Sequence, residues 1–174
     1  MSQIKVNSIV PVGGLPSGAN GGIIQVVTTM KDDVFTTHQN ANSEVAITGL
    51  NATITPSSNS SKILVYFCVQ SGNHGTTYGF YPKRGSTKVL AGSTSGIGNR
   101  QAISVPSNIP QDTNQITAAS FMGIDTPSTT SATTYQIYAI SDGGHLRVNR
   151  SSADDNSSTG KRCVSTITLM EITT

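Results

Sequence analysis

The chain has 174 residues, of which 11% are charged, and its formal net charge is +2. This length suits one compact domain with an extended terminal segment, and so small a charge excludes the electrostatic field typical of nucleic-acid-binding proteins. We therefore expect no nucleic-acid partner. No run of about 18 apolar residues occurs, so we also expect no insertion into a membrane. Ser and Thr make up roughly a quarter of the chain, a composition typical of β-strands joined by many turns.

Residues 1–22 are predicted to form an extended arm and not part of a domain. Pro11, Pro16 and five glycines between Gly13 and Gly22 interrupt any regular structure, and no apolar run typical of a secretory signal is present. Such a segment cannot bury itself, so it becomes ordered only along a partner. We expect it to anchor the protein to a larger particle through its apolar side chains, which are Ile4, Val6, Ile9, Val10 and Leu15.

A β pattern begins at Ile23, and the first clear strands are predicted over residues 23–29, 45–56 and 62–70. In the second of these, large apolar residues occupy odd-numbered positions before Gly49 and even-numbered positions after it. Such a change of parity is typical of a strand with a bulge. In the third, both parities are apolar, so we predict a strand buried on both faces. The two parities are Ile63, Val65, Phe67 and Val69 on one face and Leu64, Tyr66 and Cys68 on the other.

Further strands are predicted over residues 77–83, 87–91, 117–124, 133–141, 145–148 and 162–172, with turn residues between them. Residues 92–114 are long for a connection and should form a surface excursion. About eight to ten strands without a helical apolar stripe predict an all-β fold, an antiparallel, jelly-roll-like β-sandwich. We therefore expect two parts, the arm over residues 1–22 and one β-sandwich domain over residues 23–174.

Three short segments of the chain resemble one family. They are Gly21-Gly-Ile-Ile-Gln-Val-Val27, the strand end Ile54-Thr-Pro-Ser-Ser58 with the following Ser61-Lys-Ile-Leu-Val65, and the ending Ser165-Thr-Ile-Thr-Leu-Met-Glu-Ile172. Together they resemble the short tail-fibre-like virion proteins of tailed marine bacteriophages, of the cyanophage and pelagiphage type. The resemblance implies a structural protein of the virion, assembled in the host cytoplasm, and a homotrimer.

One glycine-rich segment, Ala91-Gly-Ser-Thr-Ser-Gly-Ile-Gly98, is similar to the cofactor-binding turn of short-chain dehydrogenases. That turn must open a helix, but residues 99–105 are few and Pro106 and Pro110 follow them. No Tyr is followed four positions later by Lys, the catalytic pair of that family. We expect no cofactor and no enzymatic activity.

Metal ligation is also not expected from the sequence. The acidic pairs Asp32-Asp33 and Asp154-Asp155 lie in polar surroundings typical of solvated loops. The three histidines, His38, His74 and His145, lack the close spacing of a metal-binding motif and could meet only in the folded chain or around an oligomer axis. Cys68 and Cys163 are predicted to be free thiols, with a disulfide as the alternative.

Aromatic residues suggest a recognition loop on the surface. Tyr78 and Tyr81, with His74 before them, could offer rings for stacking against a sugar or a peptide. The alternative is a core or edge strand limited by Pro82.

The resemblance to tail-fibre-like proteins implies a bacteriophage virion protein of the tail-fibre or neck-fibre type. Its arm would bind other tail, neck or capsid proteins, its sandwich would associate with copies of itself, and its loops could contact a glycan on the host surface. Two alternatives share the fold: a capsid decoration or cement protein, and a carbohydrate-binding module.

Overall fold

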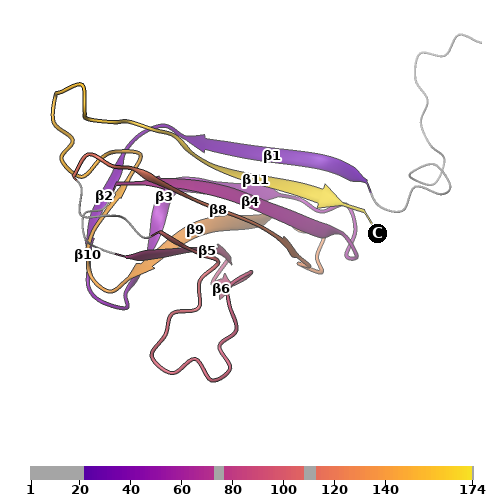
Figure 1. Cartoon of the computed structure of the whole chain (residues 1–174). Helices are drawn as coiled ribbons and strands as arrows, with labels where there is room; N and C mark the ends of the chain where they lie inside the picture. Colours follow the sequence, from indigo (N-terminus) through magenta and orange to yellow (C-terminus); the bar gives the residue numbers. More distant parts are fainter. Residues whose placement is uncertain (1–21, 73–76, 108–112, 174) are drawn as a thin grey trace, which may run out of the picture.

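The computed structural model describes residues 22–72, 77–107 and 113–173, which contain eleven strands and no helix (Figure 1). The anchoring residues predicted at Ile4, Val6, Ile9, Val10 and Leu15, and His74 of the predicted recognition loop, lie outside the described residues. The strands are β1 (Ile23–Lys31), β2 (Phe35–Gln39), β3 (Glu44–Ile54), β4 (Lys62–Ser71), β5 (Tyr78–Arg84), β6 (Thr87–Lys88), β7 (Val105–Ser107), β8 (Thr117–Asp125), β9 (Thr133–Ser141), β10 (Gly144–Val148) and β11 (Ser165–Ile172).

The strands form two antiparallel sheets that pack face to face. In the first, sheet A, the order is β1-β11-β4-β10-β2, and β8 pairs with the other side of β4. In the second, sheet B, the order is β3-β9-β5-β6, and β7 pairs with β5. The predicted antiparallel β-sandwich is therefore confirmed, and no helix that could cross a membrane occurs in the described part of the chain.

The core lies between the two sheets. One parity of β4 is completely buried there, and so are the facing residues of β3 and β9. Each residue of a strand points to the opposite face from its neighbour, so the alternating apolar residues supply this buried layer. The main contributors are Ile63, Val65, Phe67 and Val69 from sheet A, and Ile47, Leu50, Tyr135 and Ile137 from sheet B.

The bulge predicted in β3 is confirmed. Gly49 has a φ of 82°, a left-handed conformation that suits glycine, and the pairing with β9 shifts between Ala46 and Asn51. The bulge frees backbone carbonyls, and the side-chain amide of Gln136 donates hydrogen bonds to the carbonyls of Ile47 (2.8 Å) and Leu50 (3.0 Å). The change of parity therefore keeps apolar side chains on the core side on both sides of the bulge.

The prediction that β4 is buried on both faces is wrong. Its second parity points outward, where Tyr66 is 38% exposed and Leu64 and Cys68 are half-buried. Nothing in the described chain packs over this side, because sheet B covers only the inner face of sheet A.

The turn after β3 is fixed by a buried carboxylate. Glu171 Oε1 accepts hydrogen bonds from the backbone N–H of Ser57 (2.7 Å) and from the hydroxyls of Ser57 (2.6 Å) and Ser61 (2.7 Å). Burial opposes ionisation of Glu171, but these donors hold its pKa below the usual value. The serine-rich turn is thus joined to the last strand.

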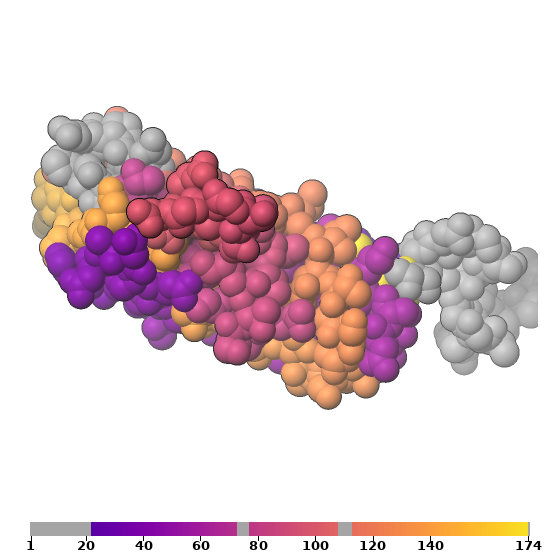
Figure 2. All heavy atoms as spheres, turned by 90° about the horizontal axis from the view of Figure 1, so that it is seen from below, coloured from indigo at the N-terminus to yellow at the C-terminus, as the bar shows by residue number. Residues whose placement is uncertain are grey.

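Two strands were not predicted from the sequence. β2 has the sequence FTTHQ with a single large apolar residue, and β7 has three residues including Pro106. Both are formed by pairing with distant strands, β2 with β10 and β7 with β5. Residues 89–104, between β6 and β7, form part of the surface excursion expected over residues 92–114, of which 108–112 lie outside the described residues. This segment projects below sheet B in Figure 1 and lies at the front of the molecule in Figure 2.

Candidate recognition surface

The sandwich has two distinct ends along its strands. At one end, which we call the arm end, the chain enters β1 beside the last residues of β11, and Gly22 and Thr173 exchange backbone and side-chain hydrogen bonds. At the other end, the loop end, lie the β2–β3 turn, the β9–β10 turn and the loop between β10 and β11 (Figure 1). The described chain therefore begins, at Gly22, at the end opposite these loops.

A shallow pocket of about 250 Å³ opens at the loop end on the side of sheet B. Its apolar surface comes from Ile103 and Ile140, and its polar lining from Gln101, Asp142 and their neighbours Thr77 and Ser141. Gly79 completes the pocket, and a side chain there would meet the side chain of Ile103 at 2.3 Å. Gln101 also reaches the β2–β3 turn through a hydrogen bond to Asn42, which ties the excursion to the sheet.

Tyr78 does not have the predicted role in surface recognition. Its ring is completely buried in the core, and its hydroxyl donates a hydrogen bond to the carbonyl of Gly144 at 3.0 Å. Burial raises the pKa of Tyr78. The ring supports the loop end from inside, while its neighbours Thr77 and Gly79 line the pocket.

Tyr81 is also fully buried, although it lies on the outer face of sheet B. Its ring stacks on Tyr138 with centroids 6.2 Å apart, and the Lys88 ammonium lies 3.9 Å from its ring centroid. Lys83 lies over the Tyr138 ring at 4.5 Å, and Glu44 forms ion pairs with both lysines. We call these five residues the Tyr81 cluster; its members cover one another, so the prediction of an exposed stacking ring is wrong here too.

One carboxylate in the Tyr81 cluster, that of Glu44, forms ion pairs with two lysines. Partial burial opposes ionisation of Glu44, but its ion pairs with Lys83 and Lys88 lower its pKa to about 2. Burial, together with the Glu44 carboxylate, raises the pKa of Tyr81. The Glu44 carboxylate is therefore satisfied within the cluster, whose two lysines and one carboxylate leave a net charge of +1.

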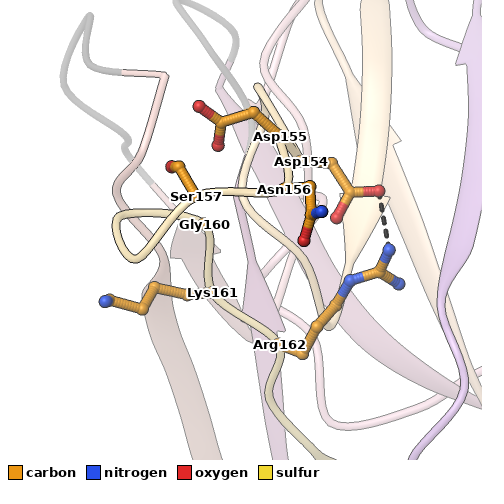
Figure 3. A pocket seen from close by; sticks show the side chains of 7 residues that line it. All are labelled: Asp154, Asp155, Asn156, Ser157, Gly160, Lys161 and Arg162. Carbon is orange, nitrogen blue, oxygen red and sulfur yellow. Dashed lines mark hydrogen bonds and ion pairs between the residues drawn. The ribbon is translucent and has the colours of Figure 1, made fainter.

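A second pocket, of about 320 Å³, is formed by the loop between β10 and β11 (Figure 3). Asp154 forms ion pairs with Arg150 (3.3 Å) and Arg162 (2.7 Å), so its carboxylate holds the loop together. Asp155 and Lys161 extend away from this ion pair in Figure 3. The other acidic pair lies in an exposed loop, where Asp33 binds Lys31 at 2.7 Å.

Two of the three histidines meet in the folded chain. His38 and His145 are directly opposed on β2 and β10, with ring centroids 4.8 Å apart. A metal site needs more ligands than these two, and no group of three His, Cys, Asp or Glu side chains suited to a metal occurs among the described residues.

The remaining sequence motifs have structural explanations. Residues 91–98 form an irregular loop in which Gly96 and Gly98 have positive φ, and residues 99–104 are not helical, so the geometry of a dinucleotide-binding turn is missing there. Cys68 and Cys163 are half-buried free thiols, as predicted.

Glu44, Lys88 and Tyr138, which complete the Tyr81 cluster, were not predicted from the sequence. They are far apart in the chain and come together only because β3, β6 and β9 belong to one sheet. The alternation of each strand predicts that these three side chains point to the outer face of sheet B. Alternation alone does not show which residues of neighbouring strands they contact.

Comparison with protein-family models and with curated proteins found no match. Among solved structures, the chain is similar to the structure of infectious bursal disease virus Gt strain (TM-score 0.42, 14% identity), covering 94% of this chain and 44% of that one. Values are similar for the crystal structure of the infectious bursal disease virus VP2 subviral particle, with a TM-score of 0.42, 14% identity and coverage of 94% and 44%. The chain spans less than half the length of these solved chains.

Proposed function

We propose that this chain is a structural protein of a bacteriophage virion, of the tail-fibre or neck-fibre type. Residues 1–22 attach it to tail, neck or capsid proteins, and the β-sandwich associates with copies of itself and presents its loop end outward. In this proposal the protein is not an enzyme, and its place is the assembled virion.

The observation that carries the proposal is the separation of the two ends. The arm joins the sandwich beside Thr173, whereas the pocket at Ile103 and Ile140 and the long loop between β10 and β11 lie at the opposite end of the strands. β1 spans nine residues, which at about 3.3 Å per residue places the two ends roughly 30 Å apart. A projection attached at one end and exposed at the other needs this arrangement.

The pocket at the loop end does not favour a carbohydrate-binding module. Sugar sites rely on an aromatic ring that stacks on the sugar. Among the described residues, no aromatic side chain lines this pocket, and Tyr78 and Tyr81 are buried. A host glycan therefore remains part of the proposal only as a ligand held by polar groups such as Asp142 and Gln101.

The test is deletion of residues 1–21 in the phage that encodes the chain. We expect the truncated protein to fold with an unchanged melting temperature but to be absent from purified particles on an immunoblot. A control variant at the loop end, Asp142→Asn, should enter particles normally. Incorporation of the truncated protein at the level of the full chain would contradict the anchoring role of the arm.

A further inference from the structure

The outer face of sheet A is unusually apolar. Seven of the nine large apolar side chains exposed in the described part of the chain belong to its strands β1, β4 and β8. The most exposed are Met122 (64%), Met30 (61%) and Val26 (56%), and the others are Ile23, Ile24, Tyr66 and Ile124. Isolated exposed apolar residues are ordinary, but a contiguous set on one sheet face marks an interaction site.

The strand pairing arranges these side chains into continuous rows. Val26 is paired with Met170, Met170 with Leu64, and Leu64 with Ile124, so one row crosses four strands without a polar residue. The next row along the strands consists of Thr28, Thr168, Tyr66 and Met122. We call the outward side chains of β1, β11, β4 and β8 the apolar face.

The apolar face is almost without charge. Lys62 is the single charged residue among the outward positions of these four strands, and it lies at the arm end opposite Ile172. The other charged residues of the same strands, Lys31, Glu171 and Asp125, have the inward parity, and Lys31 and Glu171 are buried. Two identical surfaces can approach each other only where they do not oppose like charges, and this face meets that condition.

Its size also suits a protein partner. Four strands about 4.8 Å apart, each contributing about eight residues at about 3.3 Å, give a face on the order of 500 Å² in projection. Two copies joined through this face would bury on the order of 1,000 Å² in total, which is the lower limit for a specific protein interface. A single extended segment such as the arm would cover only one strip of it.

We infer that the apolar face of sheet A is buried against a second copy of this chain. This inference rests on the proposed self-association of the sandwich and identifies the surface that mediates it. The contact is apolar at its centre, where the row from Val26 to Ile124 lies, and Lys62 is at its rim. Sheet B, whose outer face carries the Tyr81 cluster, stays outside the contact.

The test is sedimentation velocity of the purified full chain over a concentration series. We expect the wild type to self-associate and Met122→Asp to raise the dissociation constant at least about tenfold, because a carboxylate would be desolvated in the contact. Thr134→Asp is the matched control, since Thr134 is exposed on a strand of sheet B, and it should associate like the wild type. Ile124→Gln, which adds no charge, should weaken association less, and thermal melts verify that each variant is folded.

Deletion of residues 1–21 distinguishes a second copy from the arm as the occupant. We expect the truncated chain to associate as the wild type does. Loss of association on truncation would overturn the inference in favour of the arm. So would a monomeric wild type whose apolar face binds a hydrophobic dye only after truncation. A chain that is monomeric at all concentrations yet enters particles through its arm would overturn this inference and leave the proposed function standing.

Discussion

The outer faces of the two sheets differ in whether other side chains of the same chain cover them. On sheet B, Tyr81 is fully buried by residues of its own chain, with Lys88 over its ring and Glu44 paired to both lysines. On sheet A, Tyr66 occupies an equally central strand but is 38% exposed beside Met122. Charged side chains of the same chain thus cover the tyrosine on one outer face, and the other outer face stays apolar and exposed. An outward position in a strand therefore does not by itself predict an exposed side chain.

The largest difference between the two faces should appear when one tyrosine is removed from each. Tyr81→Ala removes a buried ring and its stacking and cation–π contacts, so we expect the free energy of unfolding to fall by about 3 kcal/mol. Tyr66→Ala on the apolar face should cost less than about 1 kcal/mol in the monomer. Urea unfolding at a concentration where the chain is monomeric measures both, and equal losses would remove the distinction between the faces.

A smaller effect is expected from Glu44→Gln in the Tyr81 cluster. The two lysines then lose their shared anion, and stability at neutral pH should fall by about 1 kcal/mol. The pKa of Glu44 is lowered from 4.5 to about 2 in the folded chain, so its contribution is complete above pH 4.5 and is lost as the pH falls toward 2. Acid titrations monitored by circular dichroism measure this effect. Between pH 4.5 and about 2, the wild type should lose its greater free energy of unfolding relative to Glu44→Gln. A difference in unfolding free energy that stays constant with pH would show that the Glu44 charge does not stabilise the fold.

The smallest effect on stability is expected from Met122→Gln on the apolar face. Met122 is 64% exposed and contacts no covering element of its own chain, so its unfolding free energy should change by no more than about 0.5 kcal/mol. Thermal unfolding of the dilute protein provides the measurement. A loss above 2 kcal/mol would mean that the apolar face is covered within the monomer.

Much of the fold could be predicted because one parity of each long strand is apolar. The bulge at Gly49 and the buried set from Ile63 to Val69 followed from alternation alone. The second parity of β4 is equally apolar, so the sequence could not show which face sheet B covers. β2 and β7 lack an apolar pattern of their own and depend on pairing with distant strands.

The candidate recognition surface was less predictable. Tyr78 and Tyr81 are residue types that often bind ligands, but here both are buried. Tyr78 is held by Gly144, and Tyr81 is covered by Glu44 and Lys88, all from other strands. The pocket at Ile103 and Ile140 likewise combines the excursion with β9. Such contacts between distant segments are fixed by the sheet order and not by local sequence.

A cryo-EM map of the assembled particle would show whether the molecule is attached at its arm end and exposes its loop end. We expect Ile23 and Thr173 to face the particle and Asp142 and His145 to point outward. A map in which the loop end contacts the particle and the arm end is exposed would contradict this expectation.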